Sequence, residues 1–229
     1  MTTIGLIGSG LIGGTVARLA VGAGHQVVLS NSRGPQTLRD LVSSLGPSAR
    51  AATGEEAATA GDIVLVSVPV KAYPALPAAA LAGKVVMDTG NYYPARDGQV
   101  PELDEGSLTS SEYLARNLPE AKVVKVFNNI FFKHLASLPR AAGAPDRSYL
   151  PIAGDNGDDG DGVESAKAVV SAFLDSIGYG AVDAGPLSQS WRQEPGTPVY
   201  GTPYGSFDDE KGTPAGADVI RAALAAAAR

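Results

Sequence analysis

"GLIGSGLIGGTVARLAVGAGHQVVLSNSRGP", residues 5–35, is the stretch of sequence that decides the fold. An apolar run leads through the segment GSGLIG (8–13) into a helical pattern, and a second apolar run follows at 26–30. In such a unit the first glycine permits a tight turn, the second lets the backbone approach a pyrophosphate, and the third lets helix and strand pack closely. We therefore predict a strand–helix–strand unit that binds a dinucleotide at the helix N-terminus. The residues expected to contact it are Gly8, Ser9, Gly10, Leu11 and Ile12.

The end of the second apolar run selects between the two nicotinamide dinucleotides. An Asp or Glu there would accept hydrogen bonds from the ribose of NAD and would repel the 2′-phosphate of NADP. Residues 26–39 contain no acidic side chain. Instead Asn31 and Ser32 can donate hydrogen bonds, and Arg33 can fork onto phosphate oxygens. The sequence therefore predicts that NADP(H) is the cofactor and that Asn31, Ser32 and Arg33 hold its 2′-phosphate.

Short Val/Ile/Leu runs alternate with helical patterns through the first 140 residues, which is typical of a parallel sheet covered by helices on both faces. Helices are predicted at 11–23 and 35–45, each followed by a glycine. The predicted fold class is α/β, with a doubly wound parallel sheet of order 3-2-1-4-5-6, the Rossmann fold. Its strands are expected at 3–7, 26–30, 49–52, 62–68, 84–88 and 122–127.

After about residue 140, Pro and Gly become frequent, and we predict a small C-terminal α/β extension. Its elements are expected as strands at 148–153 and 180–185 and helices at 163–177 and 215–228. The domains are therefore predicted as 1–140, which binds the dinucleotide, and 141–229, which contributes to a cleft for a second substrate. The aspartate run at 154–162 lacks the regular alternation and terminal Glu of a calcium loop. We expect a solvated turn there, with Asp161 and Glu164 capping the next helix, and no metal site.

Composition excludes several classes of function. The chain has 229 residues, of which 44% are hydrophobic, as in ordinary globular proteins. It contains no run of about 18 apolar residues and no basic leader followed by an apolar segment, so we expect a cytoplasmic protein without a membrane partner. It has no cysteine, which removes thiolate chemistry, and its formal net charge of -6 argues against a general nucleic-acid binder. The expected partner is a small redox molecule.

Ligands of open α/β sheets lie beyond the carboxyl ends of the strands. Val68 and Pro69 end the predicted fourth strand and offer an apolar edge to the nicotinamide. Asn91 and Asn128 follow the fifth and sixth strands and are expected to bind the cofactor, while Asn129 is assigned to the second substrate. The alternative for each Asn is a turn residue that satisfies its own backbone.

Groups able to act as a general acid or base are scarce. The only histidines are His25, which follows a helix-ending glycine, and His134, which lies on the predicted helix after the sixth strand. No Ser-x-x-x-Lys or Tyr-x-x-x-Lys dyad stands on a plausible helix. We therefore predict no catalytic side chain, and a reaction in which hydride passes directly between two bound ring systems whose alignment supplies most of the catalysis.

Several further segments appear in a recognisable order: SVPVKAY (67–73), MDTGNYYP (87–94), VFNNI (126–130), PIAGD (151–155) and DAGPLSQSWRQEPGTPVY (183–200). Together with the opening stretch they resemble the NADP oxidoreductases that use the deazaflavin coenzyme F-420, a family of NADPH-dependent F-420 reductases. The resemblance implies a homodimer and a cleft in which deazaflavin stacks on nicotinamide. By the match of the DAGPLS motif, Leu187 and Ser188 would touch the deazaflavin, and Ser32 and Arg33 would hold the 2′-phosphate.

The segment SWRQEPGTPVYGTPYGSF (190–207) departs from the pattern expected of the compact members of this family, because it is longer and more aromatic. Trp191 is predicted to bind the second substrate, and Tyr200 and Tyr204 can either stack on a tricyclic ring or pack the domain junction. The predicted function is an NADP(H)-dependent oxidoreductase with F-420 as the redox partner. The alternatives are reduction of a flavin or a small carbonyl or imine compound, or a non-catalytic NADP(H)-sensing module.

Overall fold

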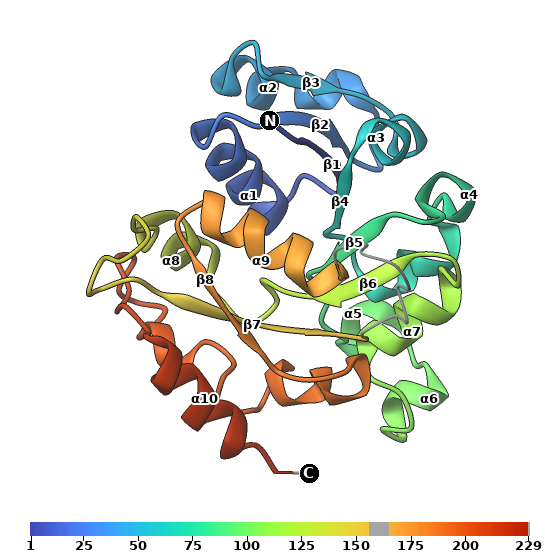
Figure 1. The fold of residues 1–229 in the computed structure, drawn as a ribbon. Coiled ribbons are helices and arrows are strands. Elements are labelled where there is room, and N and C mark those ends of the chain that lie inside the picture. Colours follow the sequence, from blue (N-terminus) through green and yellow to red (C-terminus); the bar gives the residue numbers. More distant parts are fainter. Residues whose placement is uncertain (156–164, 229) are drawn as a thin grey trace.

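A computed structural model describes residues 1–155 and 165–228. Figure 1 shows a twisted sheet with helices on both sides, and its eight strands lie in the order β3-β2-β1-β4-β5-β6-β7-β8. The strands are β1 (Thr3–Ile7), β2 (Gln26–Ser30), β3 (Ala49–Ala51), β4 (Ile63–Val66), β5 (Val85–Asp88), β6 (Lys122–Lys125), β7 (Tyr149–Gly154) and β8 (Gly180–Asp183). The predicted fold class and the order 3-2-1-4-5-6 are therefore confirmed.

The C-terminal extension continues this sheet. Strand β7 pairs antiparallel with β6, and β8 then pairs parallel with β7. One core cluster also joins side chains from both sides of residue 140, including Val16, Val124 and Val170. The sheet and the core therefore both continue past residue 140. The division of the chain into two domains at this residue stays a prediction.

Four predicted strands, β3, β4, β6 and β8, end earlier than expected. Strand β4 stops at Val66, and β6 stops at Lys125, two residues before Phe127. Phe127 has a φ of 65°, in the left-handed region, where an extended strand cannot continue. The chain therefore turns into the loop that carries Asn128 and Asn129.

The helices cover the sheet as the alternating pattern predicts. They are α1 (Leu11–Gly22), α2 (Arg39–Leu45), α3 (Gly54–Ala60), α4 (Ala78–Leu81), α5 (Pro94–Asp97), α6 (Pro101–Asp104), α7 (Ser110–Asn117), α8 (Phe132–Ser137), α9 (Ala166–Ser176) and α10 (Ala217–Ala225). Four 3-10 segments are η1 (Pro35–Leu38), η2 (Val70–Ala75), η3 (Leu187–Gln193) and η4 (Thr202–Tyr204). The predicted helix at 35–45 is thus divided into η1 and α2.

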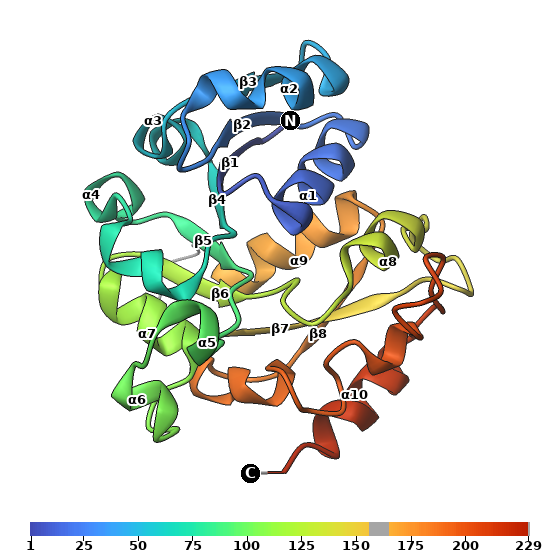
Figure 2. The ribbon, with the colours of Figure 1, turned by 180° about the vertical axis from the view of Figure 1, so that it is seen from behind.

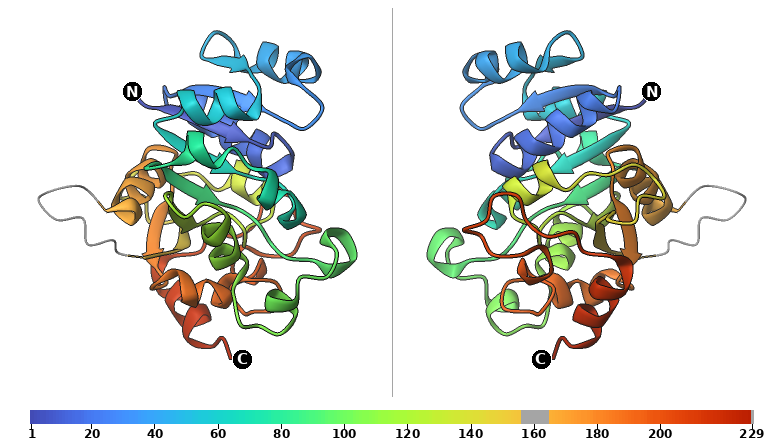
Figure 3. Two further views of the ribbon diagram at one scale, coloured as in Figure 1. Left: turned by 90° about the vertical axis from the view of Figure 1, so that its right-hand side faces the viewer. Right: turned by 90° about the vertical axis from the view of Figure 1, so that its left-hand side faces the viewer.

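Two core clusters hold these layers together. Figure 1 shows α9 crossing in front of the sheet, and its Val170 belongs to the same cluster as Val16 of α1 and Leu224 of α10. The second cluster joins Ala58 of α3 to Leu114 of α7. Figure 2 shows these two helices on one flank of the molecule and α1 on the other. The termini lie at opposite ends of the molecule (Figure 3). No helix among the described residues is both long and apolar enough to cross a membrane.

Helix α9 begins with a side-chain cap. The hydroxyl of Ser165 accepts a hydrogen bond from the N–H of Ala168, at 3.2 Å. This bond satisfies one of the helix's free N–H groups. The caps predicted for Asp161 and Glu164 lie outside the described residues.

Candidate functional site

The turn between β1 and α1 needs glycine at two positions for steric reasons. Gly8 has a φ of 103°, and a Cβ there would lie 2.2 Å from the carbonyl oxygen of Ser67. A Cβ on Gly13 would lie 2.1 Å from the carbonyl oxygen of Gly8. Both glycines therefore let strand, turn and helix approach closely, as the motif predicts.

Gly10 is different, because a Cβ at this position would have nothing within 4 Å. Gly10 is also the N-cap of the 12-residue helix α1, where no side chain caps the free N–H groups and the first turn holds no acidic residue. An uncapped helix N-terminus attracts an anion, and the open space above Gly10 gives a pyrophosphate room to approach. These residues fit a dinucleotide.

The loop after β2 presents the predicted phosphate-binding side chains. Asn31 shapes this loop: its Oδ1 accepts a hydrogen bond from the N–H of Arg33 at 2.9 Å, and its Nδ2 donates to Thr37 at 2.8 Å. Ser32 and Arg33 are exposed. Within residues 1–155 and 165–228, the Arg33 guanidinium has no hydrogen-bond or ion-pair partner, so it is available to a phosphate. We call residues 8–13 and 31–33 the nucleotide cradle.

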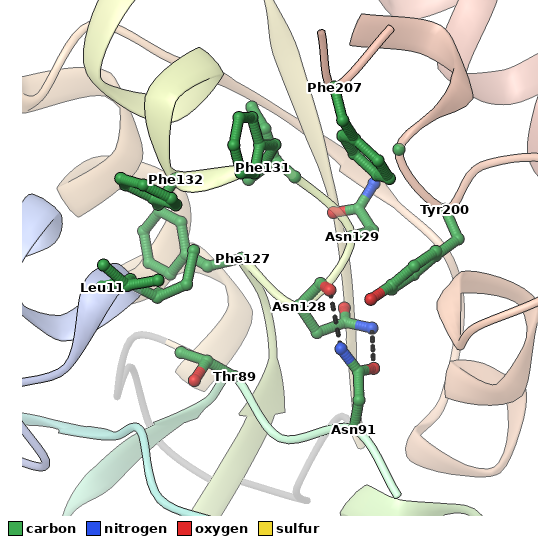
Figure 4. A pocket seen from close by; sticks show the side chains of 13 residues that line it. Leu11, Thr89, Asn91, Phe127, Asn128, Asn129, Phe131, Phe132, Tyr200 and Phe207 are labelled. Atoms are coloured by element: carbon green, nitrogen blue, oxygen red, sulfur yellow. Dashed lines mark hydrogen bonds between the residues drawn. The ribbon is translucent and has the colours of Figure 1, made fainter. Parts of the chain in front are cut away.

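A pocket with a cavity volume of about 420 Å³ adjoins the nucleotide cradle at Leu11 and Ile12. Figure 4 shows its side chains, which come from the start of α1, the loops after β5 and β6, and the C-terminal segment. Five predicted site residues line it: Leu11, Ile12, Asn91, Asn128 and Asn129. The other lining residues are Thr89, Phe127, Ile130, Phe131, Phe132, Tyr200, Gly201 and Phe207. The volume is in the usual range for a site that binds a small organic molecule.

Asn91 and Asn128 form the polar end of this pocket and bond to each other. The Nδ2 of Asn91 donates to the carbonyl oxygen of Asn128, and the Nδ2 of Asn128 donates back to the Oδ1 of Asn91, each at 2.9 Å (Figure 4). Asn128 also donates to the carbonyl oxygen of Gln193, at 2.6 Å. These amides therefore join three loops across the sheet edge, and they are not turn residues that satisfy only their own backbone.

The wall beside them carries unpaired acceptors and backbone strain. The Oδ1 atoms of Asn128 and Asn129 are buried and have no hydrogen-bond partner among the described residues. Asn129 is held by its Nδ2, which donates to the carbonyl oxygen of Val199 at 3.1 Å. Phe127, directly before this pair, is the only non-glycine residue with positive φ in the described chain. Unpaired polar groups and strained backbone are costly and gather at functional sites.

The opposite end of the pocket is aromatic. The rings of Phe131 and Phe132 meet edge to face with centroids 4.8 Å apart, and Phe207 lies 5.3 Å from Phe131. Phe207 is 56% exposed and Leu11 is 66% exposed, and both line the pocket. Apolar surface left open in a pocket favours a flat, apolar ligand.

Tyr200 borders the same pocket, and Figure 4 shows its hydroxyl pointing toward Asn91 and Asn128. This hydroxyl bonds to the hydroxyl of Tyr93, at 2.7 Å, across 107 positions of sequence. Burial and the bond to Tyr93 raise the pKa of Tyr200. The phenol therefore keeps its proton at neutral pH.

A buried ion pair fixes the loop that carries Asn91. Lys125 and Asp88 are both fully buried, with Nζ and Oδ2 3.3 Å apart. Lys125 also donates to the carbonyl oxygen of Gly90 and, at 2.8 Å, to the hydroxyl of Ser110. Several hydrogen bonds to each charge offset the cost of burying it. Sequence reasoning missed this pair because both residues lie inside strand patterns, where nothing indicates that they are neighbours.

Other predicted residues lie away from the pocket. Val68 and Pro69 are half-buried after β4 and do not line it. Leu187, Ser188 and Trp191 lie on η3, where Leu187 is 3% exposed and belongs to the hydrophobic core. These three do not line the pocket either, so the role that the resemblance implies for them stays a prediction.

His134 is also not a pocket residue. It is fully buried, and its Nε2 lies 2.6 Å from the carbonyl oxygen of Asp209. The histidine thus connects α8 to the loop at 205–214. That His134 has no catalytic role stays a prediction.

The first part of the chain is similar to a known family. Residues 3–92 match the family model described as "NADP oxidoreductase coenzyme F420-dependent". This part of the chain is therefore similar to that family. The matched residues include the nucleotide cradle and extend through the loop with Asn91. None of the curated proteins compared with the chain matches it.

Solved structures extend the likeness to the C-terminal part. A hypothetical protein from Sinorhizobium meliloti is 29% identical, with a TM-score of 0.71, over 87% of this chain and 93% of its own. A protein from Arthrobacter sp. FB24, described as a proposed F420-dependent NADP reductase, is 25% identical, with a TM-score of 0.67, over 83% and 87%. An imine reductase from Aspergillus terreus shares the fold at 18% identity and a TM-score of 0.56, over 83% and 57%. The chain is an NADP-dependent oxidoreductase with a Rossmann fold.

Proposed function

We propose that this oxidoreductase transfers hydride directly between NADPH and the deazaflavin coenzyme F-420. The observation that carries the proposal is the pocket of about 420 Å³ with one aromatic end and one amide end. It adjoins the nucleotide cradle, which lies in the part of the chain that matches the F420-dependent family. The bound nicotinamide supplies the hydride, and the protein supplies the alignment of the two rings.

Each part of the cradle has a separate task in this proposal. The N–H groups at the start of α1 hold the pyrophosphate over Gly10, and Arg33 pairs with the 2′-phosphate. Leu11 and Ile12 belong to both cradle and pocket, and so direct the nicotinamide end toward the cavity. The second N–H of Asn91 and the unpaired Oδ1 of Asn128 are then left for the nicotinamide carboxamide.

The aromatic end suits the second ring system. Phe131, Phe132 and Phe207 offer ring faces and edges to a flat heterocycle, and their apolar surface excludes water from the transfer. Asn129, assigned to the second substrate, sits in the wall between this end and Tyr200. A homodimer and a cytoplasmic location stay predictions.

A small carbonyl or imine acceptor is the second candidate, and the hydroxyl of Tyr200 in the pocket favours it, because the localised charge that hydride leaves on such an oxygen or nitrogen needs a proton donor more than the delocalised charge on reduced F-420 does. The family domain favours an enzyme over an NADP(H)-sensing module.

The test is to mix the purified protein with NADPH and F-420 and to follow the nicotinamide absorbance, then to repeat the assay with free flavins, a cyclic imine and an aldehyde. We expect oxidation of NADPH that depends on F-420. Oxidation with only the imine or aldehyde would replace F-420 by the second candidate.

A further inference from the structure

Two tyrosine hydroxyls form a short chain from the molecular surface to the pocket. Tyr93 lies in the loop after β5 and is 37% exposed, whereas Tyr200 is half-buried and lines the cavity. Their oxygen atoms are 2.7 Å apart. Part of the Tyr93 side chain is open to solvent, and the guanidinium of Arg96 lies 5.0 Å from its ring centroid. The chain of hydroxyls therefore connects solvent to the pocket.

The hydrogen-bond count at Tyr200 leaves one proton available. A phenol donates one hydrogen bond and can accept others. Among the described residues, the Tyr200 hydroxyl has only Tyr93 as a partner. When Tyr93 donates this bond, the Tyr200 proton is free, and Figure 4 shows the hydroxyl within the polar end of the pocket.

We propose that Tyr200 is a catalytic residue that gives a proton to the second substrate as hydride arrives, with Tyr93 as the relay to solvent. The proposal rests on the proposed function, since it needs a hydride acceptor in this pocket. Neither tyrosine was predicted to have this role, because their hydroxyls meet across 107 positions of sequence.

The step balances as follows. Hydride from NADPH forms a new C–H bond at the electrophilic carbon of the acceptor, and an electron pair moves to the nitrogen or oxygen of its C=N or C=O unit, either directly or along the conjugated ring system. That atom takes the proton of Tyr200. Tyr200 recovers a proton from Tyr93, and water returns one to Tyr93. In sum, NADPH, the acceptor and one proton give NADP⁺ and the reduced acceptor.

The alternative is that the hydrogen bond between the two hydroxyls, which we call the clasp, only holds the loop after β5 against the C-terminal segment. Two variants separate these roles. Tyr200→Phe removes both the clasp and the donor, whereas Tyr93→Phe removes the clasp and leaves the proton on Tyr200. Tyr113→Phe is the matched control, since Tyr113 packs on Tyr73 and does not line the pocket.

The experiment compares single-turnover hydride transfer from NADPH to F-420 in the wild type and the three variants. We expect Tyr200→Phe to slow transfer by about 100-fold, at the low end for a general acid, and Tyr93→Phe by less than about tenfold. The wild type should react more slowly in D₂O than in H₂O, and Tyr200→Phe should lose that difference. Tyr113→Phe should match the wild type.

A readout without turnover accompanies the kinetics. The fluorescence of F-420 reports its dissociation constant from the protein with NADP⁺ bound. Loss of one hydrogen bond should weaken F-420 binding about threefold to tenfold in Tyr200→Phe, with NADPH affinity and melting temperature unchanged. Equal effects of Tyr200→Phe and Tyr93→Phe on rate and binding would show a clasp and overturn the proposal.

The assays distinguish failure of the proposed function from failure of the role proposed for Tyr200. If the wild type oxidises NADPH with none of F-420, free FMN, the cyclic imine pyrroline or benzaldehyde, the proposed function is wrong, and the role of Tyr200 is wrong with it. If the wild type reduces any of them and Tyr200→Phe reacts within about threefold of its rate, only the role of Tyr200 is wrong.

Discussion

The nucleotide cradle and the pocket beside Tyr200 adjoin at Leu11 and Ile12, but they are built in different ways. The cradle comes from one strand–helix–strand unit, and its shape depends on the backbone of Gly8, Gly10 and Gly13. The pocket is assembled from separate loops joined by long-range bonds, such as Asn128 to Gln193 across 65 positions. Local sequence therefore determines the first region, and tertiary packing determines the second.

The largest expected effect separates the two kinds of glycine within the cradle. Gly10→Val should abolish NADPH binding, with an affinity loss above about 100-fold, because its side chain fills the space that a pyrophosphate needs. The melting temperature should stay near that of the wild type, since a Cβ there meets no protein atom within 4 Å. Isothermal calorimetry and thermal unfolding measure the two quantities.

Gly8→Ala is the matched control. Its Cβ would meet the carbonyl oxygen of Ser67 at 2.2 Å, and its φ is positive, so this variant should lose stability as well as binding. Normal NADPH affinity in Gly10→Val would mean that residues 8–13 are not the cradle.

The second effect tests the choice of nucleotide. Arg33→Ala should weaken NADPH binding by about 1.5–3 kcal/mol, the range for hydrogen bonds to a charged group, and should barely change NADH binding. Arg33 has no partner to lose among the described residues, so its removal should not destabilise the fold. Titrations with both nucleotides measure the difference, and equal losses for NADPH and NADH would contradict the assignment.

The two regions also differ in how far the sequence could predict them. The sheet order follows from the alternation of strand and helix patterns, and the close packing at Gly8 and Gly13 follows from their spacing within one strand–helix–strand unit. The role of Arg33 stays a prediction. The sequence placed Asn91, Asn128 and Asn129 at strand ends, but it could not show that two of them bond to each other. It missed Phe131, Phe132 and Phe207, because an aromatic residue in a helix or loop carries no sign of the cavity it faces. The early end of β6 at Lys125, before the left-handed backbone of Phe127, could not be predicted from the sequence either.

A smaller effect is expected in the aromatic end of the pocket. Phe207→Ala removes a half-exposed ring that contacts Phe131, so it should weaken binding of the second substrate by about 1 kcal/mol, or roughly fivefold in KM. NADPH affinity should not change, because Phe207 is not part of the cradle. Steady-state kinetics with F-420 measures the effect. An equal loss of NADPH affinity would mean that the pocket belongs to the dinucleotide alone.

The smallest effect on chemistry is expected at His134, which lies near the pocket in space but not in its wall. The ring is fully buried, packs edge to face on Phe131, and has its Nε2 2.6 Å from the carbonyl oxygen of Asp209. His134→Ala should therefore cost about 1–3 kcal/mol of folding stability through the lost hydrogen bond and packing. Hydride transfer should stay within roughly tenfold, about 1.4 kcal/mol of the barrier and below the usual contribution of a general acid. Denaturant unfolding and single-turnover kinetics separate the two quantities. If the rate fell a thousandfold with fold and NADPH affinity intact, His134 and not Tyr200 would be the proton donor, since a loss of that size is expected only for a group that acts in the transition state.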